Sequence, residues 1–164
     1  MKILENIASA AKTFVFGAAF LAGIAGFANA DNINQNNKYF FEANSWSDTY
    51  GDNNIHDWNQ YQGIKNNFRD DEEIILIGHD PAWTEEDNVE WRLYGPTGKI
   101  VEKGSFSPQS DGDWYHAGES LDEDIMYDLM HSSNGGDGNY KVEWYTDGVL
   151  MPGDSSFFSV SSSN

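Results

Sequence analysis

The stretch that decides the fold is Asn139–Met151, which reads NYKVEWYTDGVLM. Every second side chain in its first part is apolar, aromatic or β-branched, namely Tyr140, Val142, Trp144 and Thr146. Alternate residues of an extended strand point to the same face, so the pattern predicts a strand with one buried face. The dipeptide Asp147-Gly148 is typical of a tight hairpin turn. We therefore expect a β-hairpin whose second strand includes residues 149–151 and 157–160.

A second hairpin is predicted earlier in the chain. Residues 88–94 alternate apolar and polar side chains, and residues 99–106 resume the alternation after the turn Gly95–Gly98. In the returning strand the spacing places one set of side chains on a common face: Ile100, Glu102, Gly104 and Phe106. Cysteine is absent, so stability must come from apolar and aromatic burial instead of disulfides.

Three further strands are predicted nearer the N-terminus. Lys38–Trp46 is rich in aromatic residues, and Tyr61–Phe68 has the polar spacing of an edge strand. The β-branched run in Ile74–Gly78 is typical of a strand buried on both faces. We therefore expect residues 31–62 to contribute an N-terminal strand and a long acidic loop to the same domain as residues 63–164.

One segment interrupts the β pattern. Ile125, Met126, Leu129 and Met130 fall at helical intervals, and Ser120 precedes Glu123 at the spacing of a capping box. The sequence predicts one short inserted helix over residues 121–132. A strand that uses Ile125, Tyr127 and Leu129 is the alternative.

The order of predicted strands over residues 63–160 resembles the bacterial immunoglobulin-like (Ig-like) and fibronectin type III-like domains. The resemblance is carried by Phe68 before the acidic turn, the buried strand Ile74–Ile77, and the segments Leu93–Gly98, Gly138–Tyr145 and Phe158–Val160. It implies an all-β, antiparallel Ig-like β-sandwich of about seven strands. By analogy of fold alone, it also implies an adhesive or accessory module.

The first thirty residues have the order of a signal peptide. Lys2 and Lys12 precede the apolar run Thr13–Phe27, and the small residues of Ala28–Ala30 form a cleavage site. The apolar run is shorter than the roughly twenty residues that a membrane-spanning helix needs. We therefore expect cleavage after Ala30, a periplasmic or secreted protein, and no membrane insertion after signal cleavage. An uncleaved anchor is the alternative.

The charge of the chain restricts its partners. The formal net charge is −18, with 27 acidic against 9 basic side chains. Such a surface repels nucleic acid and anionic lipid, so neither is expected as a partner. Calcium is the cofactor that the acidic loops suggest, because it prefers oxygen ligands. The candidate ligands are Asp48, Asp52, Asp57, Asp111, Asp113 and Asp137, although the same residues are common in turns without a metal.

No enzyme motif is present in the sequence, and no catalytic residue is nominated. The sequence lacks a nucleophile elbow, a phosphate-binding glycine loop and a His-Glu-x-x-His motif. Several aromatic residues lie in or beside polar loops, where a ligand could stack on them: Trp46, Tyr50, Trp58, Tyr61 and Trp83. We therefore predict an exported, non-enzymatic module that binds a protein or glycan partner through its loops. The alternatives are a calcium-dependent carbohydrate-binding or matrix module and a small hydrolase using loop carboxylates; oligomeric state is left open.

Overall fold

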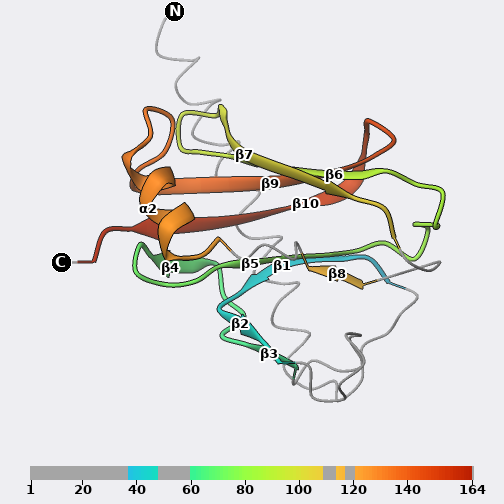
Figure 1. Ribbon diagram of the computed structural model, residues 1–164, viewed down its shortest axis with the longest axis horizontal. Coiled ribbons are helices and arrows are strands. Elements are labelled where there is room, and N and C mark those ends of the chain that lie inside the picture. Colours follow the sequence, from blue (N-terminus) through green and yellow to red (C-terminus); the bar gives the residue numbers. More distant parts are fainter. Residues whose placement is uncertain (1–36, 48–59, 109–113, 117–120, 164) are drawn as a thin grey trace, which may run out of the picture. The chain divides into compact units, whose positions relative to one another are not determined.

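The computed structural model describes residues 37–47, 60–108, 114–116 and 121–163. All of them belong to one compact unit, Asn34–Asn164, and the predicted signal segment lies outside the described residues. The described chain is all-β apart from one short helix (Figure 1). Its elements in order are β1 (Tyr39–Ala43), β2 (Ser45–Trp46), β3 (Tyr61–Gln62), β4 (Asn67–Arg69), β5 (Ile75–His79), β6 (Val89–Tyr94), β7 (Ile100–Phe106), β8 (Trp114–His116), α2 (Glu123–His131), β9 (Gly138–Thr146) and β10 (Val149–Ser161).

The strands β9 and β10 form the central hairpin of a five-stranded sheet with the order β4-β10-β9-β6-β7. Asp147 and Gly148 both have positive φ, at 51° and 79°, which is the turn geometry that matches the twist of two antiparallel strands. The alternation in β9 is as predicted, because Tyr140, Val142 and Trp144 are all buried. The sequence therefore predicted this hairpin correctly.

The β6–β7 hairpin is also confirmed, with one local difference. Trp91 pairs with Gly104 and Leu93 with Glu102, but Tyr94 pairs with Ile100, so the register shifts by one residue at Val101. This bulge returns Val101 to the core and leaves Ile100 43% exposed. The prediction that Ile100 shares a face with Gly104 was therefore wrong, because an extra residue reverses the alternation.

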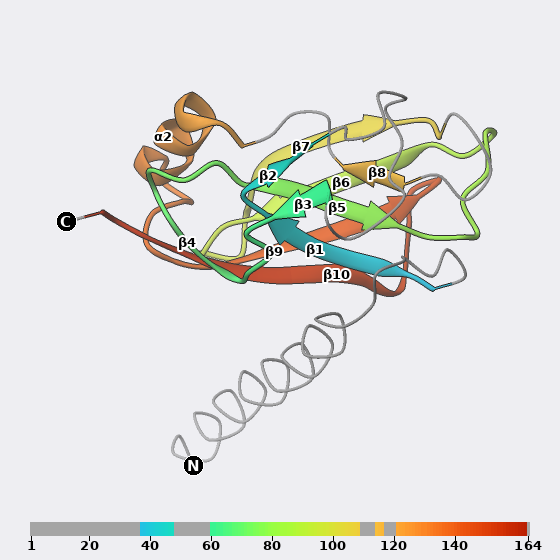
Figure 2. The ribbon, with the colours of Figure 1, turned by 90° about the horizontal axis from the view of Figure 1, so that it is seen from below.

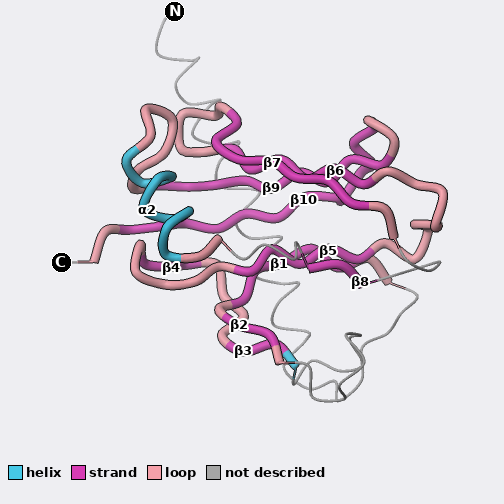
Figure 3. Tube along the Cα trace, viewed as in Figure 1, coloured by secondary structure: helices cyan, strands magenta, loops and turns pink. Residues whose placement is uncertain are grey.

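The second large sheet has three strands in the order β1-β5-β8, and β5 is buried on both faces as predicted. Leu76 belongs to the core that the two sheets enclose, whereas Ile77 lies on the other face with its strand partner Phe41. The Phe41 ring meets Tyr61 edge-on, with 5.3 Å between the ring centroids. The β2–β3 ribbon lies on this other side of the three-stranded sheet (Figures 1 and 3).

The two large sheets pack against each other through aromatic side chains. From β1, Phe40 contacts Trp144 of β9 at 5.9 Å between ring centroids, and Trp83 contacts the same indole at 6.1 Å. Figure 2, viewed from the side of the three-stranded sheet, shows β1 running beside β10. The inward aromatic residues thus provide the burial that the absence of cysteine requires.

Two predicted strands are divided, and the five-stranded sheet is mixed. Lys38–Trp46 becomes β1 and β2, separated at Asn44, and Tyr61–Phe68 becomes β3 with the start of β4. Strand β4 pairs parallel to β10, with Phe68 opposite Val160, whereas every other strand pair is antiparallel among the described residues. The short strand β8 was not predicted.

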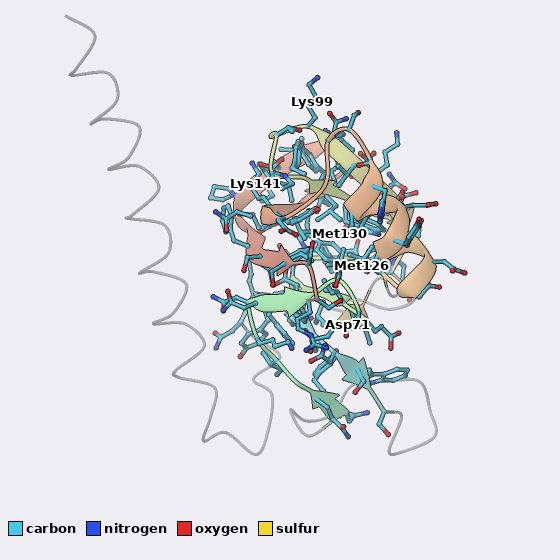
Figure 4. The ribbon with its side chains drawn as sticks, turned by 90° about the vertical axis from the view of Figure 1, so that its left-hand side faces the viewer. Asp71, Lys99, Met126, Met130 and Lys141 are labelled. Atoms are coloured by element: carbon cyan, nitrogen blue, oxygen red, sulfur yellow. The ribbon has the colours of Figure 1, made fainter. Side chains whose placement is uncertain are left out.

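Helix α2 confirms the predicted helix, with a different N-cap. The Asp122 side chain accepts a hydrogen bond from the Ile125 backbone N–H at 3.0 Å, so Asp122 caps the helix and the predicted cap at Ser120 was wrong. Met126 and Leu129 are buried in the core. Figure 4 shows Met126 and Met130 between the helix and the strands, with Lys141 on the other side of the strands. Over the described residues, no helix is both long and apolar enough to cross a membrane.

Candidate functional site

The aromatic residues predicted to bind a ligand do not form one exposed cluster in the described structure. Trp83 is 1% exposed, and its indole N–H donates a hydrogen bond to the Thr146 hydroxyl at 3.0 Å. Tyr61 is 5% exposed and packs on Phe41. These two rings are core side chains with no surface for stacking; Trp46 is half-buried, and Tyr50 and Trp58 lie outside the described residues.

Of the predicted calcium ligands, only Asp137 belongs to the described residues. Asp48, Asp52, Asp57, Asp111 and Asp113 lie outside the described residues. One oxygen of Asp137 accepts hydrogen bonds from the backbone N–H and the hydroxyl of Ser162, both at 2.8 Å. Asp137 therefore ties down the C-terminal segment. Within the described ranges, no three His, Cys, Asp or Glu side chains are grouped so that they could hold a metal ion.

Two carboxylates and one ammonium group form an ion cluster between β1 and β10. The Lys38 ammonium lies 2.5 Å from Asp80 and 2.9 Å from Asp154, and the Asp154 side chain is fully buried. Burial raises the pKa of Asp154, while the hydrogen bond from Lys38 opposes that rise. Between Leu150 and Ser155, β10 contains three more residues than the β9 segment it faces, and Asp154 closes this bulge. Because both carboxylates already pair with Lys38, we interpret the cluster as an anchor for the bulge.

A second buried carboxyl group lies farther along β1. Glu42 is 0% exposed, and one of its oxygens accepts a hydrogen bond from the Ser156 hydroxyl. The other oxygen has no hydrogen-bond partner among the described residues. Burial raises the pKa of Glu42 to about 8, because the charged form loses its hydration. This group makes the stability of the domain sensitive to pH.

The outward-facing side of the five-stranded sheet carries a regular set of aromatic and charged side chains. Across β10, β9, β6 and β7, the strand register aligns them in three rows. We call this set the tyrosine face. Its rows are Phe157, Lys141, Tyr94 and Ile100; then Ser155, Glu143, Arg92 and Lys103; then Leu150, Tyr145, Glu90 and Ser105.

Arg92 and Tyr145 form the most closely packed pair on the tyrosine face. The Arg92 guanidinium carbon lies 3.9 Å from the centroid of the Tyr145 ring, a cation–π contact. Glu90 accepts a hydrogen bond from the Arg92 Nε, and this bond raises the pKa of Arg92. The guanidinium is therefore held in one orientation with its side chain still 29% exposed.

A second cation–π contact lies beside the first. The Lys141 ammonium is 4.8 Å from the Tyr94 ring centroid and 2.6 Å from Glu143. Tyr145 donates a hydrogen bond to Glu143 at 2.7 Å, and the two tyrosine hydroxyls are 3.3 Å apart. Partial burial raises the pKa of Glu143, but the hydrogen bonds from Lys141 and the tyrosines lower it overall. The connected side chains form a preorganised polar and aromatic surface.

The charge of the tyrosine face differs from that of the whole chain. Arg92, Lys103 and Lys141 stand against Glu90 and Glu143, whereas the chain as a whole carries −18. Exposed apolar atoms add to the face at its edges, because Ile100 is 43% exposed and Leu150 is 40% exposed. Tyrosine and arginine are enriched in protein interfaces and among their energetic hot spots.

Compared with known proteins, the chain matches no family model and no curated sequence. The geometry of the site must therefore support any functional proposal. The sequence analysis predicted a binding site in the loops and assigned no role to the outward-facing residues of the strands. The signal for the tyrosine face was nevertheless present, because the outward positions of 90–94 and 141–145 contain two tyrosines, an arginine and a lysine.

Proposed function

We propose that this protein is an exported, non-enzymatic interaction module with an Ig-like β-sandwich fold, and that it recognises a protein partner through the tyrosine face. Export is inferred from the order of residues 1–30. The Ig-like assignment is inferred from two facing β-sheets and from the hairpins β6–β7 and β9–β10. This revises the sequence-based expectation of binding through loops.

The observation that carries the proposal is the pair of cation–π contacts made by Arg92 with Tyr145 and by Lys141 with Tyr94. Ion pairs and hydrogen bonds within the chain already fix these side chains, so binding would lose little side-chain entropy. Preorganised tyrosine and arginine groups at the centre of a surface are the typical hot spots of protein recognition.

Site-specific photo-crosslinking in the organism that makes the protein would test this function. A photoreactive residue replaces Tyr94 in one variant and Asp128, an exposed residue of α2, in a matched control. We expect a discrete protein adduct from position 94 and none from position 128. An adduct from position 128 alone, or a glycan adduct from position 94, would contradict a protein-binding tyrosine face.

A further inference from the structure

We propose that the partner of the tyrosine face is a second copy of this chain, related by a two-fold axis that runs parallel to the strands midway between β6 and β9. The inference rests on the proposed function, because it names the occupant of the same surface. Two-fold dimers use one self-complementary patch on both copies, so each residue of the patch must suit its image. The register of the tyrosine face allows this condition to be examined row by row.

The central row is complementary in charge. In this row Glu143 on β9 is the register partner of Arg92 on β6. The proposed axis places β6 of one copy over β9 of the other. Arg92 of each copy would therefore lie over Glu143 of the other copy. Two equivalent ion pairs would then form near the middle of the interface, where charge complementarity fixes the register of two surfaces.

In the two rows on either side, the same two-fold rotation also brings compatible side chains together. In one row Lys141 pairs with Tyr94, so the ammonium of one copy would face the phenol of the other. In the other row Tyr145 pairs with Glu90, so the phenol of one copy would lie over the carboxylate of the other. The Tyr145 hydroxyl would then donate to that carboxylate in place of Glu143 of its own chain. At the outer strands of the face, Phe157 would lie over Ile100, which joins two apolar side chains.

The overall charge favours this face over other surfaces for contact between copies. Two chains of formal charge −18 repel each other strongly. On the tyrosine face, three cations outnumber two carboxylates, so this repulsion is locally relieved. Dimerisation should therefore strengthen as salt screens the remaining negative charge, since exposed charges interact over a Debye length of about 10 Å at 0.1 M salt.

The size of the face indicates a weak dimer. Four strands spaced by about 4.8 Å and about five residues along each strand, with a margin for side chains, give an area on the order of 600 Å² per copy. A dimer would bury on the order of 1,200 Å², which is the lower end of specific interfaces. We expect a dissociation constant in the micromolar range.

Sedimentation equilibrium of the purified exported protein tests the inference, at about 0.05 and 0.3 M salt. We expect a reversible dimer that tightens at the higher salt. Arg92→Glu should weaken the dimer at least about tenfold, and the charge exchange Arg92→Glu with Glu143→Arg should restore most of the affinity. Arg69→Glu on strand β4 is the matched control, because it changes the net charge equally at an exposed side chain of the same sheet that lies outside the three rows.

A monomer at every concentration and salt would overturn the inference. So would equal weakening by Arg92→Glu and Arg69→Glu, which would indicate a net-charge effect, or no recovery in a charge-exchange variant whose thermal unfolding matches the wild type. The proposed function fails separately. A monomeric protein that still gives an adduct to a different protein from position 94 retains the function and loses only this partner.

Discussion

The indole of Trp144 packs against the backbone of Gly78, so that a β-carbon at residue 78 would lie 3.0 Å from Trp144 Cε2 and 3.1 Å from Cδ2. Gly78 is in β5 and Trp144 in β9, so this contact joins the two large sheets. The sheets approach closely here because glycine has no side chain. Any larger residue must move an indole that Phe40 and Trp83 also contact.

Gly78→Ala should therefore destabilise the domain by overpacking. We expect a loss of about 1 to 3 kcal/mol in the free energy of unfolding, measured by urea denaturation followed by tryptophan fluorescence. Ser105→Ala on the exposed face of β7 is the control, with a change within about 0.5 kcal/mol. A neutral Gly78→Ala variant would mean that the sheets are farther apart than described.

Glu42 should give the domain a marked dependence on pH. Its pKa is about 8 in the folded state against an ordinary value of 4.5. Between these two values the folded chain holds a proton that the unfolded chain releases, so the free energy of unfolding falls as the pH rises through this window. Above the window the loss is complete, and below pH 4.5 it disappears.

Glu42→Gln removes this titration while keeping an oxygen that accepts the Ser156 hydrogen bond. We expect the variant to be more stable than the wild type above pH 8, by on the order of 2 to 4 kcal/mol. Denaturation curves from pH 4 to 9 provide the measurement, with the exposed Glu73→Gln as control. Parallel pH profiles for Glu42→Gln and the wild type would show that Glu42 is not buried as described.

Replacing Lys38 should lower the free energy of unfolding, because the two carboxylates that it pairs with would lose their cation. Lys38→Met leaves Asp80 and Asp154 buried without a cation, and we expect a loss of about 2 to 4 kcal/mol near neutral pH. The loss should shrink in acid, because burial raises the pKa of Asp154 and the group can take up a proton. Adding Asp154→Asn should recover part of the stability at neutral pH. If chemical denaturation shows no loss in Lys38→Met, the ion cluster is not an anchor.

Thr146→Val should act on the environment of Trp83. The substitution preserves the shape of the side chain but removes the oxygen that accepts the indole hydrogen bond at 3.0 Å. We expect a loss of about 1 to 2 kcal/mol, because a buried donor is left without a partner. The tryptophan emission maximum should also shift. Unchanged stability and emission would be inconsistent with this hydrogen bond.

The hairpins could be predicted because the features that determine them lie within short stretches of sequence. Alternation in 139–146 and the turn Asp147-Gly148 fix both the buried face and the connection. The bulge at Val101 was not predicted, because the sequence of 99–106 does not show which residue is left without a partner in β6. The bulge reverses the alternation of buried and exposed side chains on the two sides of Val101. The parallel pairing of β4 with β10 joins residues nearly a hundred positions apart, and no local pattern specifies such a partner.

The candidate site was missed for a related reason. Each tyrosine of the tyrosine face looks like an ordinary outward residue in its own strand, and only the register of β6 against β9 places Arg92 over Tyr145 and Lys141 over Tyr94. In contrast, Trp83 is followed by the polar residues 84–88 in the sequence, but its side chain is buried in the core. A neighbouring polar sequence therefore did not indicate an exposed ring.

Hydroxyl-radical footprinting of the unmodified protein is the most direct test of the tyrosine face as its contact surface. Reactivity of Tyr94 and Tyr145 is compared between the protein in its native setting and the dilute purified protein. Tyr127, which is 62% exposed on α2, is the internal reference. We predict protection of Tyr94 and Tyr145 in the native setting and unchanged reactivity of Tyr127. Protection of Tyr127 with full reactivity at Tyr94 and Tyr145 would contradict the account.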